Sequence, residues 1–366
     1  MTKRLLVLLS ILALVFAACG GDDGGTDDTD GGSATTEAAG GGGDDGIIVG
    51  VSWNNFNEPR WANFDEPAII EAVEAGGGTY ISTDAGSSAD KQLADVENLI
   101  SQGADVIIIL AQDGTAILPA VQAALNEGIP VIAYDRLIED PGAFYLTFDN
   151  IGVGRIEAEV IYGLVPEGNY AIIKGNSADA NADFLREGME EIIGDAVAAG
   201  DITIVCEEYT DNWDPAIAQT NMEQCLTQNN NEIDAVLAQN DGMAGGVVAA
   251  LEAQGLAGTV PVSGQDGDVN ALNRVALGTQ AVSVWKDSRI LGKTAGEVAI
   301  ALANGTALAD IEGSIQFDTP GGNTMTTILL DPNPITQENL QEVVDAGVIT
   351  QEALCQGVDA GSVPPC

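Results

Sequence analysis

From residue 47 onward, short apolar segments alternate with longer amphipathic segments, and only short turns separate them. A short apolar segment between turn signals predicts a strand, and one without polar alternation predicts a strand buried on both faces. Strands are predicted at residues 47–51, 79–82, 106–110, 131–134, 144–148, 170–173, 202–205, 235–238, 260–263, 281–284 and 326–330. Amphipathic helices are predicted between most of them, for example at 90–102, 116–127, 183–193, 216–228 and 291–303. This alternation predicts an α/β fold in which helices cover parallel sheets.

The alternating segment is too long for a single hydrophobic core. It has about 320 residues, which is more than one core usually organises. Two lobes are therefore predicted. The border is expected at residues 148–152, where one series of strands and helices ends and a second begins.

The N-terminal segment has the features of an export signal. Lys3 and Arg4 precede an apolar run at residues 5–16, which is too short to remain as a membrane-spanning helix. The small residues before Cys19 resemble the lipobox of bacterial lipoproteins, in which cleavage leaves the cysteine as the lipid-carrying N-terminus. Residues 1–19 are therefore expected to be a lipoprotein signal peptide, the alternative being an ordinary signal peptide with a chance cysteine.

Residues 20–46 consist almost entirely of Gly, Asp, Thr, Ser and Ala. Such a segment buries too little apolar surface to offset the entropy lost when a chain is ordered. We expect a disordered Gly/Asp-rich tether that holds the folded part just off the outer face of the cell membrane.

The chain is strongly acidic and contains no histidine. It has 12 Lys and Arg against 56 Asp and Glu, and 10 against 48 remain when the signal and the tether are set aside. Such a surface repels nucleic acid and anionic lipid, so no nucleic-acid partner is expected, and membrane contact is expected only through the lipid on Cys19. The lack of histidine removes the commonest general base and metal ligand.

Four cysteines remain once Cys19 is assigned to a lipid. Outside the cytoplasm such cysteines usually pair. We expect Cys206 to pair with Cys225 and Cys355 with Cys366, because each couple is close in sequence. Free buried thiols are the alternative. A zinc site is not expected, because the chain has neither a histidine nor a Cys-x-x-Cys motif.

The predicted strand at 131–134 ends at an acid beside a base, Asp135 and Arg136. Ligands of open α/β sheets lie at such carboxyl ends of strands. An ionised Asp accepts hydrogen bonds at two oxygens and Arg donates them from a planar fork, so the pair can bind hydroxyl groups, which both donate and accept. The pair therefore favours a polyol such as a sugar, and the alternative is a surface ion pair.

Similar polar and aromatic residues follow other predicted strands in both halves of the chain. They are Arg60, Trp61, Trp213, Asn240, Asp266 and Lys286. A flat aromatic face can bury the apolar face of a pyranose while charged groups bind the hydroxyls at its rim. Each tryptophan alone is better explained by packing, but the whole set favours a carbohydrate ligand.

Several longer motifs occur in one order between residues 47 and 303. They include Arg60-Trp61, Tyr134-Asp135-Arg136, Phe148-Asp149-Asn150, Gly168-Asn169-Tyr170, Asn240-Asp241 and Ser263-Gly264-Gln265-Asp266. This series resembles the xylose-binding proteins of bacterial ABC sugar transporters. The resemblance implies a periplasmic-binding-protein type I fold, with two Rossmann-like lobes joined by a three-crossing hinge. It also implies that the sugar is bound by Arg60, Trp61, Asp135, Arg136, Asn181, Trp213, Asn240, Asp266 and Lys286.

The same resemblance implies hinge crossings near Asp149, Gln280 and Thr306. The N-terminal lobe would then comprise residues 47–149 and 281–306, and the C-terminal lobe residues 150–280 and 307–366. The implied function is that of a monomer that closes on D-xylose or a related aldopyranose and delivers it to an ABC permease. The chain departs from the family after residue 110, where Gln112 and its neighbours replace an expected aromatic residue, and this leaves the identity of the sugar open.

A glycoside hydrolase and a sugar-sensing receptor are the two alternative classes of function. A glycoside hydrolase needs two carboxylates of which one stays protonated, whereas Asp135 lies beside Arg136 and Asp266 comes from the other lobe, so both should stay ionised. No enzyme activity is therefore expected. No cofactor or metal is expected either, because the calcium-loop pattern that begins at Asp266 has Ala271 in place of glycine. A receptor that senses sugar and signals through a membrane kinase or chemoreceptor remains open as the alternative.

Overall fold

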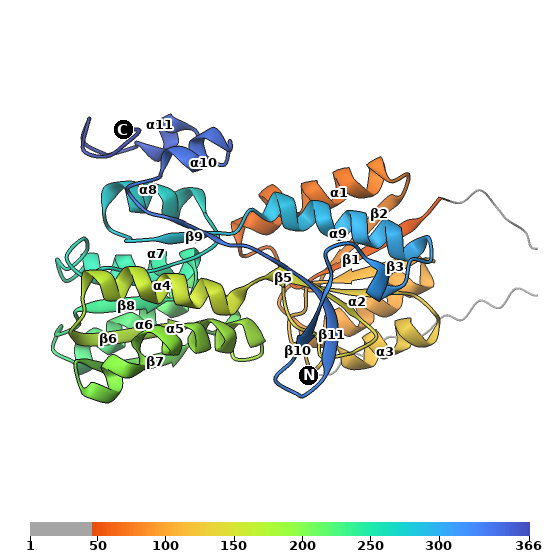
Figure 1. Ribbon diagram of the computed structural model, residues 1–366, viewed down its shortest axis with the longest axis horizontal. Coiled ribbons are helices and arrows are strands. Elements are labelled where there is room, and N and C mark those ends of the chain that lie inside the picture. Colours follow the sequence, from red (N-terminus) through yellow and green to blue (C-terminus); the bar gives the residue numbers. More distant parts are fainter. Residues whose placement is uncertain (1–45) are drawn as a thin grey trace, which may run out of the picture. The chain divides into compact units, whose positions relative to one another are not determined.

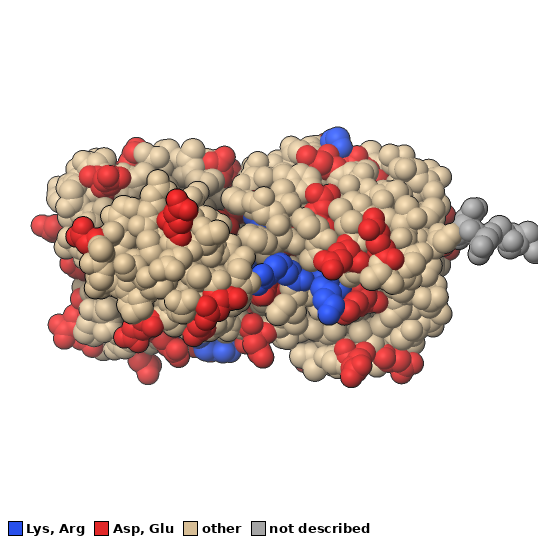
Figure 2. Space-filling view, turned by 90° about the horizontal axis from the view of Figure 1, so that it is seen from above, with Lys and Arg blue, Asp and Glu red and all other residues tan. Residues whose placement is uncertain are grey.

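The computed structural model describes residues 46–366, which form one unit with two lobes (Figure 1). The expected signal peptide, Cys19 and the tether up to residue 45 lie outside the described residues. Within residues 46–366, no helix is both long and apolar enough to cross a membrane. Acidic side chains are spread over both lobes on the face seen in Figure 2, where Lys and Arg are few.

The N-terminal lobe is built around a seven-stranded sheet with the strand order β10-β11-β5-β4-β3-β1-β2. Its strands are β1 (Ile48–Trp53), β2 (Thr79–Asp84), β3 (Val106–Ile109), β4 (Val131–Tyr134), β5 (Phe144–Phe148), β10 (Ile315–Asp318) and β11 (Thr324–Leu330). All neighbouring strands are parallel except β10 and β11, which pair antiparallel. Strands β3 and β4 are buried along their whole length, which explains their uninterrupted apolar sequences.

Helices cover both faces of this sheet. Alternate residues of each strand point to opposite faces, and each set packs against different helices. Val106 and Ile108 pack in one hydrophobic cluster with helices α1 and α9. Ile107 and Ile109 pack in a second cluster with helices α2 and α3. The helical segments of this lobe are η1 (Trp61–Asp65), α1 (Glu66–Ala75), α2 (Ala89–Ser101), α3 (Leu118–Asn126), α9 (Ser288–Ala303) and η3 (Leu308–Asp310).

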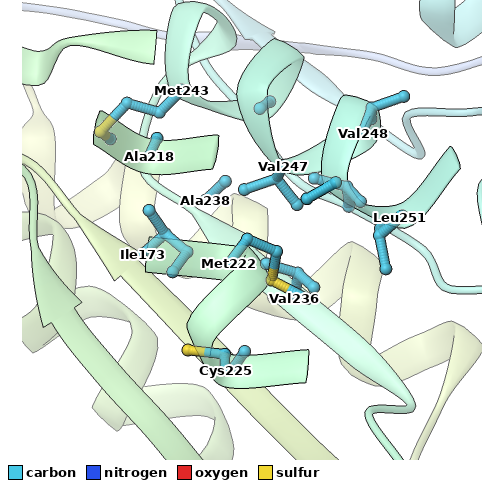
Figure 3. Close-up of a cluster of buried hydrophobic side chains, with 14 of the residues drawn as sticks. Ile173, Ala218, Met222, Cys225, Val236, Ala238, Met243, Val247, Val248 and Leu251 are labelled. Atoms are coloured by element: carbon cyan, nitrogen blue, oxygen red, sulfur yellow. The ribbon is translucent and has the colours of Figure 1, made fainter. Parts of the chain in front are cut away.

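The C-terminal lobe has a parallel three-stranded sheet in the order β7-β6-β8, also covered on both faces. Helices α4 and α5 pack on one face, and α6 and α7 pack on the other. Figure 3 shows the second face, where Ile173 and Val236 of the sheet lie near Met222 of α6 and Val247 of α7. The elements are β6 (Gly168–Lys174), β7 (Ile202–Tyr209), β8 (Ala235–Ala238), α4 (Asn150–Leu164), α5 (Ala180–Ala199), η2 (Asp211–Trp213), α6 (Pro215–Gln228) and α7 (Asp241–Glu252).

The remaining elements of this lobe pack around a separate small cluster of apolar side chains. They are α8 (Val269–Leu277), β9 (Ser283–Trp285), β12 (Asn333–Ile335), α10 (Gln341–Asp345) and α11 (Gln351–Leu354). Strands β9 and β12 pair antiparallel. The last two helices therefore belong to the C-terminal lobe, as Figure 1 shows.

Most predicted strands are present, but the one predicted at 260–263 is not a continuous strand. Val260 and Val262 form only isolated bridges, and Pro261 between them has no N–H to donate to a neighbouring strand. The strand predicted at 281–284 is shifted to β9, at Ser283–Trp285. Strand β10 was not predicted, because its residues are largely exposed and lack an apolar run.

The chain crosses between the lobes three times, and two crossings differ from the expected positions. The first follows β5 at Asp149, as expected. The second lies between β9 and α9 at residues 286–287 rather than near Gln280, and the third lies between β11 and β12 at residues 331–332 rather than near Thr306. Residues 307–330 therefore belong to the N-terminal lobe, not the C-terminal one, because β11 pairs with β5 and completes the first sheet.

Both predicted disulfides are confirmed. Cys206 of β7 is bonded to Cys225 of α6, with their Cα atoms 5.9 Å apart. Cys355 is bonded to Cys366, with their Cα atoms 5.3 Å apart, and this bond closes the C-terminal segment on itself. Both disulfides lie in the C-terminal lobe and away from the expected sugar contacts.

Candidate ligand-binding site

All nine residues expected to bind a sugar line one cavity between the two lobes. The N-terminal lobe contributes a loop after β1 and the turn after β4. The C-terminal lobe contributes the segments after β6, β7 and β8 and the segment between α7 and α8, and the hinge contributes the segment after β9. The lining residues are Glu58, Arg60, Trp61, Asp135, Arg136, Asp179, Asn181, Trp213, Asn240, Gln265, Asp266 and Lys286. Glu58, Asp179 and Gln265 were not predicted.

Arg60 lies at the centre of the charged groups and is buried. Its Nη2 lies 2.9 Å from Oδ1 of Asp65 and 3.3 Å from Oδ2 of Asp135. Its Nη1 lies 3.2 Å from Oδ1 of Asp266, which belongs to the other lobe. Burial opposes the charge of the guanidinium, but the three carboxylates together raise the pKa of Arg60 further above its usual value. Arg60 is therefore a permanent cation that organises carboxylates from both lobes.

Asp135 is ionised, as the sequence analysis expected. Burial by itself raises the pKa of Asp135, but Arg60, Lys286 and Arg136 outweigh burial, and the pKa is lower than its ordinary value. Its buried Oδ2 forms the ion pair with Nη2 of Arg60 and has no further polar partner among the described residues. Because this oxygen lies in the cavity lining, it is placed to accept a hydrogen bond from a ligand hydroxyl.

The backbone is strained at three of the predicted residues. Asp135, Trp213 and Asp266 have positive φ angles of 63°, 57° and 108°. Side chains other than glycine rarely adopt such angles, and they cluster at functional sites where the surrounding structure enforces them. Here the backbone N–H of Asp135 donates to the carbonyl of Leu146 at 2.8 Å. The backbone N–H of Asp266 donates to the carbonyl of Val284 at 2.9 Å.

The two predicted tryptophans lie in different lobes and are both buried. Trp61 packs against Trp53, with ring centroids 6.3 Å apart. The guanidinium carbon of Arg60 lies 4.2 Å from the ring centroid of Trp61. Trp213 donates from Nε1 to Oδ2 of Asp179 at 3.1 Å, and its ring lies so close to Gly175 that no side chain could stand there. Packing therefore fixes both rings, and both line the cavity.

Arg136 and Asn181 are held by partners within the protein. Nε of Arg136 lies 2.9 Å from Oδ2 of Asp179. Nδ2 of Asn181 donates to the carbonyl of Asp135 at 3.1 Å, and its Oδ1 accepts from Asn150 at 3.0 Å. Since both ends of the Asn181 amide are engaged, this residue fixes the strained turn at Asp135.

Glu58 and Asp179 are carboxyl groups that the sequence analysis missed. Burial, followed by the charge of Asp266, raises the pKa of Glu58 to about 8, against the opposing effect of its hydrogen bond with Asn240. Burial also raises the pKa of Asp179, although Arg136 opposes this. The third missed residue, Gln265, donates from Nε2 to the carbonyl of Gln239 at 2.8 Å and leaves its buried Oε1 without a partner in the described part of the chain.

Gln112, which replaces an expected aromatic residue, does not line the cavity. Its Nε2 donates to Oδ1 of Asn212 in the other lobe at 2.7 Å. It therefore bridges the lobes beside the cavity. Gly242 lies under the carboxyl group of Glu58.

The cavity is small, because side chains from the two lobes approach each other across it. Its volume is about 20 Å³, about enough for one water molecule. A pyranose ring is larger, so a sugar can enter only when the lobes move apart and the side chains rearrange.

Among residues 46–366 there is no group of three or more carboxylate or cysteine side chains arranged to hold a metal ion.

Comparison with known proteins agrees with this architecture. A family model described as "Periplasmic binding protein domain" matches residues 49–307. The solved structure of an ABC transporter solute binding protein from Clostridium phytofermentans with bound β-D-glucose is similar, with a TM-score of 0.75 and 27% identity over 84% of this chain and 99% of that chain.

Two curated relatives match most of the described residues. The D-xylose-binding periplasmic protein of Escherichia coli (strain K12) is 36% identical over 300 residues, which cover 81% of this chain and 88% of that protein. The multiple sugar-binding periplasmic receptor ChvE of Rhizobium radiobacter is 30% identical over 320 residues, which cover 82% of this chain and 89% of that protein. This chain therefore belongs to the periplasmic binding protein family, has its type I fold, and is a solute-binding protein rather than an enzyme.

Proposed function

We propose that this protein binds a monosaccharide between its two lobes outside the cytoplasm and delivers it to an ABC permease. The proposed ligand is D-xylose or a related aldopyranose. The relative that is 36% identical carries the name of a D-xylose-binding protein, and a structural neighbour holds β-D-glucose. Both names support an aldose as the ligand of this chain.

The observation that carries this proposal is the combination of groups around one cavity. Trp61 and Trp213 come from different lobes and line it together with an ionised Asp135. Aromatic faces suit the apolar face of a pyranose, and charged groups suit its hydroxyls. The buried Oε1 of Gln265 lacks a hydrogen-bond partner within residues 46–366, and Oδ2 of Asp135 is held there by the ion pair with Arg60 alone. Both oxygens support the binding of a ligand rich in hydroxyl groups.

A calorimetric screen of aldopentoses and aldohexoses tests the proposal. Xylose, arabinose, glucose and galactose are titrated into the purified protein, and the sugar is recovered and analysed afterwards. We expect saturable binding of at least one sugar, with xylose tightest, and recovery of that sugar unchanged. Absence of binding to every sugar, or recovery of a chemically altered sugar, would contradict the proposed function.

Closure of the lobes around the sugar is a direct consequence. Residues of both lobes are needed around one small ligand, and the cavity of about 20 Å³ admits it only after opening. Saturating xylose should therefore shift an equilibrium from open toward closed. Small-angle X-ray scattering should show a smaller radius of gyration with xylose than without it. A sugar that gives no heat in the screen serves as the control, and equal radii with and without xylose would refute closure.

We further propose that Cys19 carries the lipid that anchors the protein to the outer face of the cell membrane. The small residues before Cys19 and the Gly/Asp-rich tether after it support this assignment. Cys19→Ser should release the protein into the medium in membrane fractionation. Cys206→Ser, which leaves the lipobox intact, is the matched control and should stay with the membrane. Retention of Cys19→Ser in the membrane fraction would remove the anchor from the proposal.

A sensory role is the second candidate function. It is favoured by one observation, the name "receptor" of the Rhizobium radiobacter relative, which is 30% identical. Measurements of sugar uptake and of sugar-dependent signalling in cells that lack this protein distinguish the two roles. Loss of sugar uptake supports delivery to a permease, whereas normal uptake with loss of a sugar-dependent signal supports sensing.

A further inference from the structure

Glu58 contacts both lobes although it belongs to the N-terminal one. It lines the cavity and is only 7% exposed. Its Oε1 accepts a hydrogen bond from Nδ2 of Asn240 at 3.0 Å. Asn240 is the N-cap of α7 in the C-terminal lobe, where its Oδ1 accepts from the N–H of Met243. The hydrogen bond between Glu58 and Asn240 can therefore exist only while the lobes are closed.

The second oxygen of the Glu58 carboxyl group is available to a ligand. A Cβ atom at Gly242 would lie 3.3 Å from Oε2, so this oxygen lies over the first turn of α7. Within residues 46–366, the bond with Asn240 is the one hydrogen bond that the Glu58 side chain makes. Since Glu58 lines the same cavity as Asp266 and Asn240, Oε2 is placed to meet a hydroxyl of the ligand.

We propose that Glu58 is a further sugar-contacting residue, which binds a sugar hydroxyl as a neutral carboxylic acid and fastens the closed lobes through Asn240. The inference rests on the proposed sugar-binding function and adds a residue and a proton to it. A neutral carboxyl group both donates and accepts, which matches a hydroxyl group, whereas an ionised one accepts only.

The surroundings of Glu58 favour its neutral form. Burial and the negative charge of Asp266 raise its pKa from the ordinary 4.5 to about 8, while Asn240, Arg136 and Arg60 oppose the increase. The charged groups that share the cavity with it are Arg60, Asp135, Arg136, Asp179, Asp266 and Lys286, and Asp268 lies close enough for Glu58 to raise its pKa. When the lobes open, Glu58 gains access to water and its pKa should return toward the ordinary value.

Closure should therefore take up a proton. The pKa is higher in the closed form, so the contribution of Glu58 to closure is fully present below about pH 4.5, decreases as the pH rises, and levels off above about pH 8. With these two values, the affinity for sugar at pH 6 should exceed that at pH 8 by up to about 50-fold.

Asp241 titrates in the same range but should contribute little. Burial raises its pKa to about 7, and its carboxylate accepts hydrogen bonds from Ser283, Gln280 and the backbone of Gly267. All three partners lie in the C-terminal lobe, so the surroundings of Asp241 stay the same when the lobes separate. Its protonation is therefore not coupled to closure.

The experiment is calorimetry of xylose binding at pH 6.5 in two buffers of different ionisation enthalpy, which gives the number of protons bound. For the wild-type protein we expect uptake approaching one proton per sugar, and a decrease in affinity of up to about 50-fold between pH 6 and 8. Glu58→Gln is always neutral and should bind with no proton uptake and with affinity that is nearly constant over this range. Asp268→Asn is the matched control and should keep most of the uptake.

Two failures can be told apart. A wild-type protein that binds none of the sugars contradicts the proposed function and, with it, this inference. A wild-type protein that binds sugar without proton uptake, or a Glu58→Gln protein with undiminished uptake, contradicts the inference and leaves the proposed function intact. Uptake that disappears in Asp268→Asn but persists in Glu58→Gln would assign the proton to Asp268 and also overturn the inference.

Discussion

Replacing Arg60 by methionine should lower the free energy of unfolding by about 3 to 5 kcal/mol and abolish measurable sugar binding. Methionine fills similar space but leaves Asp65, Asp135 and Asp266 near one another without the cation they share. Asp65 is fully buried, and burial raises its pKa to about 6 even with Arg60 present. Removing the guanidinium therefore leaves uncompensated negative charge in an environment that solvates it poorly.

Arg155→Met is the matched control for this change. The Arg155 side chain is 40% exposed and pairs with Glu191 at the surface, so its loss should cost less than about 1 kcal/mol. Unfolding in urea at pH 7 measures both variants. Acidification to pH 5 should recover part of the stability of Arg60→Met, because its carboxyl groups can then be protonated. A cost below about 1 kcal/mol for Arg60→Met would show that the charged cluster does not organise the lobe.

Replacing Asp266 by alanine should weaken sugar binding by about 2 to 4 kcal/mol, or roughly 30-fold to 1,000-fold. Each hydrogen bond from a sugar hydroxyl to an ionised carboxylate contributes about 1.5 to 3 kcal/mol. Asp266 also joins the lobes, since its Oδ1 lies 3.2 Å from Nη1 of Arg60 and 3.5 Å from Nζ of Lys286. Its removal therefore affects both the ligand contact and the closed arrangement.

Alanine at position 266 also has to adopt the positive φ of 108°, so a second variant separates strain from lost contacts. Asn tolerates positive φ better than most residues and has nearly the shape of Asp without its charge. Asp266→Asn should weaken binding less than Asp266→Ala, because neutral hydrogen bonds are weaker than charge-assisted ones. Glu252→Ala, at the exposed end of α7, should bind as the wild type does. Unchanged affinity in both Asp266 variants would remove this residue from the site.

The sequence predicted the lobes better than it predicted their boundaries. The short apolar runs of β3 and β4, which follow turn residues, predict buried strands, and the structure places them in the interior of the first sheet. The return of the chain to that sheet through β11 could not be predicted, since β11 pairs with β5, which is far from it in sequence. Strand pairing depends on contacts between distant segments, and the local pattern of β11 is the same in either lobe.

Most residues that line the candidate cavity were predictable, because they follow the ends of apolar strands. Asp135 directly follows β4, and the residue pattern there already indicated a ligand. Asp179 follows β6 and is the N-cap of α5, so the same rule could have found it. Glu58 carries no such signal, because it lies in the irregular segment after β1 and becomes part of the cavity only through its contact with Asn240 in the other lobe.

The measurement that tests the central claim most directly is a crystal structure of residues 46–366 with bound xylose. We predict that the sugar lies between the lobes, with its ring against Trp61 and Trp213 and its hydroxyls on Asp135 and Asp266. A second hollow, of about 730 Å³, lies between α1 and α9 and is lined by Phe64 and Arg289 among others. Xylose bound in that hollow, with the cavity between the lobes unchanged, would contradict the account.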